Sequence, residues 1–200
     1  MRILGIIAEY DPFHRGHERH LRLAKQIVQP DFTYVVMSSC FKQRGDLAMM
    51  APADRTECAL TAGADAVFAL PVGWTVRDAE HYATGAVSLL ASLGTTHLAF
   101  GAETADVAQL AEIADRLENP TAALRNVLRE SLREGYGYPK ALSLAVGREN
   151  EKQGKMLSMP NNILAISYLR AILRLRAEIL PVAVGRNGNY HAETVQVLGT

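Results

Sequence analysis

Five short apolar runs, rich in valine, isoleucine, leucine and alanine, alternate along the chain with stretches of helical periodicity. Each run ends at or beside a glycine, proline, serine or acidic residue, and buried strands of a parallel sheet have this length and composition. The runs cover residues 2–9, 33–39, 64–71, 96–103 and 179–186. Because strand and helix alternate, we expect a doubly wound, Rossmann-like α/β fold with a five-stranded parallel sheet.

Apolar residues at helical spacing predict a helix between the early runs. These helices cover residues 18–27, 51–63 and 78–94. The pattern of residues 105–176 is almost entirely helical, apart from a polar stretch at 147–160 that is predicted to be a mobile loop. The prediction is therefore a sheet domain of residues 1–104 and 177–200, with residues 105–176 forming a helical insertion before the last strand.

Charge and cysteine content argue against a strongly basic nucleic-acid-binding protein, a membrane-binding protein and a disulfide-rich secreted protein. Lysine and arginine together number 21, as do aspartate and glutamate, so the formal net charge is zero and gives no chain-wide attraction for nucleic acid or membrane. The most basic stretch is residues 133–155. Cys40 and Cys58 lack metal-type spacing and indicate reduced thiols in a cytoplasmic protein. The opening MRILGIIA is too short for a signal peptide and no run is long enough to span a membrane, so we expect no membrane contact.

The segment AEYDPFHRGHERH, residues 8–20, follows the first predicted strand. In parallel α/β sheets the first strand-to-helix turn is the usual phosphate cradle, because the backbone N–H groups that open the helix have no helical partners. Gly16 would let a phosphate approach the backbone, and the rings of His14 and His17 would donate N–H groups to its oxygens. The segment therefore predicts a site for a nucleotide α-phosphate.

A metal site is the main alternative for these histidines. His14, His17 and His20 form an HxxHxxH series, and histidines three residues apart share a helix face. Against a metal, His14 precedes the helix proper and no carboxylate or cysteine is obviously paired with the series. A surface helix with histidines that have no special role is the third interpretation. The strand–turn–helix context favours the phosphate site, and we expect no metal ligands.

At these residues the chain resembles the HxGH-type nucleotidyltransferase superfamily and, more specifically, the N-terminal half of the bacterial tRNA(Met) cytidine acetate ligase family. The similar segments occur in family order and span nearly the whole chain. They are GIIAEYDPFHRGHERHLRLAK, VVMSSCFKQRGDLAMMAPADRTECALTAGADAVFALP, FGAE, PNNILAISYLRAI and GRNGNYHAE. The resemblance implies that the sheet domain is a nucleotide-binding domain.

The resemblance implies an ATP-dependent ligase that activates acetate as acetyl-adenylate, with release of pyrophosphate. The acetyl group then passes to N4 of the wobble cytidine of elongator tRNA(Met), and AMP is released. ATP, acetate and tRNA(Met) are the implied partners, with Mg²⁺ expected on the pyrophosphate. His14 and His17 are the implied catalytic residues. The implied ATP-binding residues are Ile7, Ala8, Glu9, Tyr10, Asp11, Pro12, Phe13, His14, Arg15, Gly16, His17, Glu18, Arg19, His20, Gly101, Asn161 and Arg186.

Three of these residues lie far from the histidine turn, and each has an ordinary interpretation. Gly101 ends the fourth run, where it would admit adenine or ribose or simply terminate a strand. Asn161 follows Pro160 where a helix begins, so that without the resemblance an N-cap is the natural interpretation. Arg186 follows the fifth run and is either a phosphate partner or a surface arginine.

Other polar side chains are weaker candidates. Lys42 and Arg44 follow the second run and would hold pyrophosphate or an RNA backbone, or belong to a solvated loop. Tyr136 and Tyr138 are close in sequence to Lys140 and would stack on bases, or pack between helices.

The superfamily's second nucleotide motif, a Ser/Thr-rich turn that ends in Ile-Arg, is expected after the fifth run, and residues 187–200 do not contain it. The acetate ligases are about twice as long as this chain, so we expect a fragment or a short form. Two other functions remain open. One is an adenylyl- or cytidylyltransferase acting on a small phosphorylated metabolite, and the other is a nucleotide-binding module without catalysis.

Overall fold

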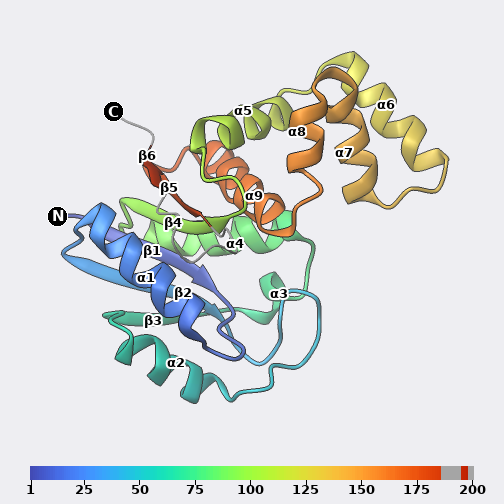
Figure 1. Ribbon diagram of the computed structural model, residues 1–200. Coiled ribbons are helices and arrows are strands. Elements are labelled where there is room, and N and C mark those ends of the chain that lie inside the picture. The colour runs from blue at the N-terminus through green and yellow to red at the C-terminus, as the bar shows by residue number, and fades with distance from the viewer. Residues whose placement is uncertain (186–194, 198–200) are drawn as a thin grey trace.

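The computed structural model describes residues 1–185 and 195–197, with side chains for 1–185 (Figure 1). Six strands form one sheet in the order β3-β2-β1-β4-β5-β6. They are β1 (Ile3–Ala8), β2 (Phe32–Ser38), β3 (Ala66–Leu70), β4 (His97–Ala102), β5 (Leu180–Gly185) and β6 (Val195–Val197). β1 to β5 are parallel, which confirms the five predicted strands and the doubly wound class. β6 pairs antiparallel with β5 and was not predicted, because three residues are too few to show a strand period.

The sheet reverses its winding between β1 and β4. The chain runs outward from β1 through β2 to β3 and then returns to place β4 on the other side of β1, where Leu4 pairs with His97. Doubly wound sheets bind their ligands outside the carboxyl ends of the strands at such a switch point. Here that position lies beyond Ala8 of β1 and Ala102 of β4.

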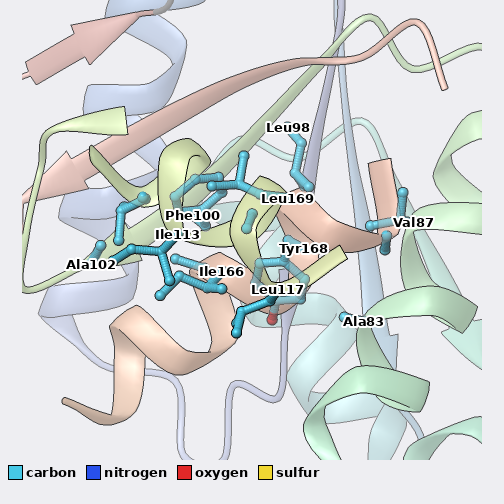
Figure 2. Packing of buried hydrophobic residues seen from close by; sticks show 14 of the residues in the cluster. Ala83, Val87, Leu98, Phe100, Ala102, Ile113, Leu117, Ile166, Tyr168 and Leu169 are labelled. Atoms are coloured by element: carbon cyan, nitrogen blue, oxygen red, sulfur yellow. The ribbon is translucent and has the colours of Figure 1, made fainter. Parts of the chain in front are cut away.

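Helices cover both faces of the sheet (Figure 1). α1 (Arg15–Val28) and α2 (Pro52–Thr61) lie on one face, where Leu21 and Ala24 of α1 pack with Leu4 and Ile6 of β1. α4 (Ala79–Ser92), α5 (Val107–Glu118) and α9 (Pro160–Leu175) form the core of the other face. Figure 2 shows this second core, which joins Ala83, Val87, Leu98, Phe100, Ala102, Ile113, Leu117, Ile166, Tyr168 and Leu169. Each buried Leu, Ile or Phe of this kind contributes about 1.5–3 kcal/mol of hydrophobic stabilisation.

Three helices extend beyond the layered part of the molecule (Figure 1). They are α6 (Ala122–Arg133), α7 (Tyr138–Glu149) and α8 (Glu151–Met156). α5 and α9 begin and end the helical stretch of residues 105–176. α9 packs on α4 and β4, and α5 packs on α9 and β5. The division of the chain into 1–104 with 177–200 and 105–176 stays a prediction. A further short helix, α3 (Val72–Thr75), was not predicted.

A cluster of two arginines and two glutamates ties α9 to α4 and α5. Arg170 is almost buried and donates to Glu80 at 2.8 Å and to Glu118 at 2.6 Å. Arg174 also bonds both carboxylates. Burial raises the pKa of Glu118, but the hydrogen bonds from Arg174 and Arg170 outweigh burial and hold the pKa below its ordinary value. The cluster lies on the second face of the sheet. No helix among the described residues is long and apolar enough to cross a membrane.

The predicted mobile loop at 147–160 is wrong. Most of the segment is helical, and Gln153, Met156 and Leu157 in and beside α8 are buried. The helix escaped prediction because α8 is only 6 residues long and its other side chains are polar. Two glycines allow it to pack, since Gly154 faces Gly147 of α7 across the helix crossing.

Adding a methyl group at this crossing is expected to destabilise the protein. A Cβ on Gly154 would lie 2.5 Å from the Cα of Gly147 and 2.8 Å from the carbonyl oxygen of Ser143, both of them backbone atoms. We expect Gly154→Ala to lower the free energy of unfolding by about 1–3 kcal/mol in urea denaturation. Gly147→Ala is the matched control, because its closest new contact is an ordinary 3.5 Å. Equal stability of the two variants would contradict the tight crossing.

Candidate functional site

The turn between β1 and α1 carries the histidine motif. Helix α1 begins at Arg15, and His14 is its N-cap residue, in extended backbone conformation. The ring nitrogen Nδ1 of His14 accepts a hydrogen bond from the backbone N–H of Gly16 at 3.0 Å. A neutral imidazole that accepts at Nδ1 carries its proton on Nε2. The cap therefore presents His14 as an Nε2–H donor.

Gly16 has a structural reason that differs from the expected one. A Cβ on Gly16 would lie 2.8 Å from Cε1 and 3.0 Å from Nδ1 of His14. Close approach of a phosphate was the expected reason for a glycine at this position. In the structure its bare backbone first makes room for the imidazole that caps the helix.

His17 lies within a cluster of rings. The imidazoles of His14 and His17 are stacked, with centroids 3.7 Å apart and planes inclined by 21°. The ring centroid of His17 lies 4.9 Å from that of Tyr10 and 5.7 Å from that of Phe13. The cluster fixes two imidazole rings side by side at the start of α1.

The backbone of Tyr10 adopts an uncommon conformation. Its φ of 53° lies in the left-handed region, and the next peptide bond, Asp11–Pro12, is cis. A non-glycine residue in this region costs of order 1–3 kcal/mol and persists only when its surroundings hold it. The ring of Tyr10 is buried against Phe13 and His17, and this burial raises the pKa of its hydroxyl. The ring of this strained residue thus packs directly against His17 of the histidine pair.

Arg55 of α2 is fully buried behind this turn and was missed by the sequence analysis. Its guanidinium donates to backbone carbonyls only: to Glu9 at 2.6 Å, to Ser38 at 3.1 Å, and to Ser39 and Met50. No carboxylate in the described part of the chain forms an ion pair with it. Arg55 therefore joins the carboxyl ends of β1 and β2 and the end of the 39–50 loop.

Asp11 and Glu9 attach the 39–50 loop to the histidine turn. The carboxylate of Asp11 accepts the backbone N–H groups of Met49 and Met50, both at 2.9 Å, and lies 3.8 Å from Nζ of Lys42. Glu9 accepts the backbone N–H of Gln43 at 2.7 Å. Lys42, which sequence alone left between a phosphate ligand and a solvated loop residue, is thus paired with the motif's own aspartate.

The charge on Asp11 is expected to make stability depend on pH. Burial raises the pKa of Asp11, but the N–H groups of Met49 and Met50 and the charges of Arg55 and Lys42 together leave it below its ordinary value. A carboxyl with a lowered folded-state pKa stabilises the fold above its unfolded pKa of about 3.9, and this contribution is lost as pH falls through the folded pKa. We expect Asp11→Asn to unfold more easily than the wild type at pH 7.

The stability difference between the wild type and Asp11→Asn should then shrink below about pH 4, near the ordinary aspartate pKa. Urea denaturation of both proteins between pH 7 and 3 measures it. A difference that stays constant over this range would contradict a lowered pKa. Asp46→Asn is a control, since this exposed aspartate lies in the same loop.

A second carboxylate links β4 to α9. Glu103 follows β4 and accepts the backbone N–H groups of Asn161 at 3.2 Å and of Asn162 at 2.8 Å, and the side-chain amide of Asn161 at 2.7 Å. Burial raises the pKa of Glu103, but these hydrogen bonds outweigh it and leave the pKa lowered. The N-cap of α9 is Met159, so the N-cap interpretation of Asn161 is wrong: Asn161 lies inside the first turn and is held by a carboxylate from another element.

The structure brings most of the expected residues to one edge of the sheet. His14 and His17 follow β1, Gly101 lies near the end of the adjacent β4, and Asn161 is bound to Glu103 just beyond it. Arg186 lies outside the described residues. No group of three histidine, cysteine, aspartate or glutamate side chains is placed to hold a metal ion within residues 1–185.

A parallel sheet with its switch point at β1 and β4, and a histidine-capped helix at that point, are typical of α/β domains that bind nucleotides. The family follows from comparison with known sequences. Residues 1–198 match the family described as HIGH Nucleotidyl Transferase, and the chain belongs to this family.

Known proteins are similar to this chain in sequence, and one solved structure is similar in fold. A tRNA(Met) cytidine acetate ligase from Syntrophomonas wolfei is 43% identical over 196 residues, which cover 94% of this chain and 47% of the relative. One from Fervidobacterium nodosum is 40% identical over 189 residues, with coverage of 94% and 44%. A crystal structure of Thermotoga maritima TmcAL bound with alpha-thio ATP has a TM-score of 0.91 and 36% identity, covering 96% of this chain and 48% of that one. The chain spans about half the length of these relatives.

Proposed function

We propose that this chain carries the acetate-activating step of a cytoplasmic tRNA(Met) cytidine acetate ligase. ATP and acetate would form acetyl-adenylate and pyrophosphate, and the acetyl group would pass to N4 of the wobble cytidine of elongator tRNA(Met). The observation that carries the proposal is the hydrogen bond from Gly16 N–H to Nδ1 of His14, which makes Nε2 a donor at the switch point. The names of the relatives, and the alpha-thio ATP bound to Thermotoga maritima TmcAL, support the choice of substrates.

The first step needs charge stabilisation and alignment rather than a protein nucleophile. An acetate oxygen attacks the α-phosphorus, and the bond to the pyrophosphate oxygen breaks as that oxygen takes the electron pair. Negative charge grows on the α-phosphate oxygens, where the Nε2–H of His14 and the neighbouring ring of His17 would donate. One such donor is typically worth a factor of about 10²–10³ in rate.

The second step releases AMP. The N4 amine of cytidine attacks the acetyl carbonyl, the bond to the adenylate oxygen breaks, and the amine loses one proton. Mg²⁺ is assigned to the triphosphate as part of the substrate, and no step is routed through it. The described residues contain no group of three histidine, cysteine, aspartate or glutamate side chains placed to hold a metal ion.

In this proposal, Glu103 determines the orientation of bound ATP between α1 and α9. Helix N-termini attract anions, but the N-terminus of α9 already holds the Glu103 carboxylate, which would repel a phosphate. The phosphates would therefore lie at α1, and the ribose or adenine would lie beside Gly101 and Asn161. The ATP contacts of residues 7–20 and Arg186 remain part of the proposal.

The contacts of Lys42 favour the ligase over a metabolite nucleotidyltransferase. A phosphorylated metabolite requires cations for its second phosphate, and Lys42, Arg44 and Arg186 were the candidates. Lys42 is paired with Asp11. A nucleotide-binding module without catalysis would bind ATP but show no turnover, whereas both enzymes would show turnover.

Pyrophosphate exchange into ATP, measured with and without acetate, tests the proposal. We expect acetate-dependent exchange that falls by about 10²–10³ in His17→Ala. His97→Asn is the control, because His97 lies at the amino end of β4, on the opposite edge of the sheet. Exchange that needs no acetate would point to another acceptor. ATP binding by calorimetry without any exchange would indicate a binding module.

A further inference from the structure

The outer side of α6 carries three arginines at four-residue intervals. Arg125, Arg129 and Arg133 are all exposed, and none forms an ion pair with any residue that the structure describes. A rise of 1.5 Å per residue places successive arginines about 6 Å apart along the helix axis. This distance is close to the separation of neighbouring phosphates in an extended RNA strand. The three guanidiniums are thus available to an external anion.

The acidic residues of α6 lie on its other flank. Leu124 is buried and marks the inner side of the helix. At 100° per residue, the arginines lie between about 100° and 180° from Leu124, while Glu130 and the adjoining Glu134 lie between about 240° and 280°. The net charge of α6 therefore understates the positive charge of its arginine flank.

Exposed aromatic side chains follow the arginines. α6 ends at Arg133 with Glu134 as its C-cap, and Gly135 turns the chain with a φ of 89°. Tyr136 and Tyr138 are then 44% and 50% exposed. Lys140 is exposed in the first turn of α7. Tyr10, Tyr82 and Tyr168 bury their rings, whereas the two half-exposed rings follow the line of cations along the chain. Cationic groups along a backbone track, with rings on which bases stack, are typical of single-stranded nucleic-acid sites.

This surface belongs to the part of the molecule that extends from the edge where the histidines lie. α5 begins soon after β4 ends, and α8 leads back to α9, whose first turn is held by Glu103. Figure 1 shows α6, α7 and α8 extending beyond α5 and the start of α9. An RNA with one base at the histidine turn would have further nucleotides near these helices.

We propose that the α6 surface, formed by Arg125, Arg129, Arg133, Tyr136, Tyr138 and Lys140, binds the RNA acceptor through its phosphates and unpaired bases. The proposal rests on the proposed function for the identity of the acceptor. It explains how a chain with zero net charge binds a polyanion, because the positive charge is concentrated on one flank of one helix. It also gives a role to the tyrosines that sequence analysis left between stacking and packing.

Fluorescence anisotropy with a labelled elongator tRNA(Met) transcript tests the surface. We expect Arg125→Gln/Arg129→Gln/Arg133→Gln to weaken binding at least about tenfold near 0.1 M salt, and to reduce the slope of log K against log salt by about two to three, since each phosphate contact contributes about 0.7–0.9. Tyr136→Ala/Tyr138→Ala should weaken binding with little change in this slope. Glu130→Gln should strengthen tRNA binding, because it removes a negative charge from α6. Arg22→Gln is the control for Arg129→Gln, since Arg22 is an exposed arginine on α1, and it should leave tRNA binding unchanged.

Acetate-dependent pyrophosphate exchange is measured on the same variants, because it needs no RNA. The proposal requires normal exchange in the triple variant together with lost tRNA affinity. Unchanged tRNA affinity or an unchanged salt slope in the triple variant would overturn the proposal. It would also be overturned if the triple variant lost self-association in sedimentation but bound tRNA normally, because the surface would then join copies of the chain. If the wild type shows no exchange but binds tRNA through these residues, the proposed function fails and the surface stands.

Discussion

Replacing His14 by asparagine is expected to remove most of the acetate activation and leave the fold intact. The asparagine Oδ1 takes the place of Nδ1 and can still accept from Gly16 N–H, and asparagine is a good N-cap residue. It has no group in the position of Nε2. We therefore expect stability within about 0.5 kcal/mol of the wild type and pyrophosphate exchange lowered by about 10²–10³.

Glutamine at the same position gives the opposite expectation. Its side-chain amide reaches the position of Nε2 but does not cap the helix, so stability should fall by about 0.5–2 kcal/mol while part of the exchange remains. Thermal or urea unfolding and exchange are measured on both variants. Parallel loss of stability and exchange in the two variants would show that His14 acts only as a cap.

Replacing Arg55 by methionine is expected to cause the largest loss of stability in the chain. The change removes donors from the carbonyls of Glu9, Ser38, Ser39 and Met50, which are buried or partly buried, and leaves these acceptors without their partner. Each acceptor left unpaired costs about 1–3 kcal/mol, so we expect a total loss of about 3–5 kcal/mol. Urea denaturation measures the loss, and Arg22→Met, an exposed arginine changed in the same way, should stay within about 0.5 kcal/mol.

Lysine at position 55 separates the charge of Arg55 from its geometry. An ammonium group keeps the charge but cannot reach all four carbonyls in one plane, so Arg55→Lys should lose at least half as much stability as Arg55→Met. A lysine variant as stable as the wild type would mean that Arg55 supplies charge alone.

The parallel strands and the histidine turn were predictable because local sequence determines them. Buried strands need continuous apolar residues, as in β1 and β2, and the strand–turn–helix order places the histidine motif at a helix N-terminus. The five strands and the family are confirmed. The individual site residues stay predictions, although His14 and Asn161 lie at the expected edge.

The remaining features depend on contacts between distant segments. Arg55 is 46 residues from Glu9, and Glu103 is 58 from Asn161, so no periodicity connects either pair. A signal for Arg55 did exist, since it takes the place of an apolar residue on the inner face of α2 beside Ala59. β6 and α8 were missed because short elements carry too little pattern, and α8 packs through glycines rather than large apolar side chains.

Transfer of an isotope from acetate to AMP tests the central claim most directly. The protein is incubated with ATP, ¹⁸O-labelled acetate and hydroxylamine, which replaces the cytidine amine as acceptor, and the AMP is analysed by mass spectrometry. Attack of acetate on the α-phosphorus predicts AMP with one ¹⁸O, together with acetohydroxamate, and loss of both in His14→Asn. Label found in inorganic phosphate or pyrophosphate, or AMP without label, would contradict the account.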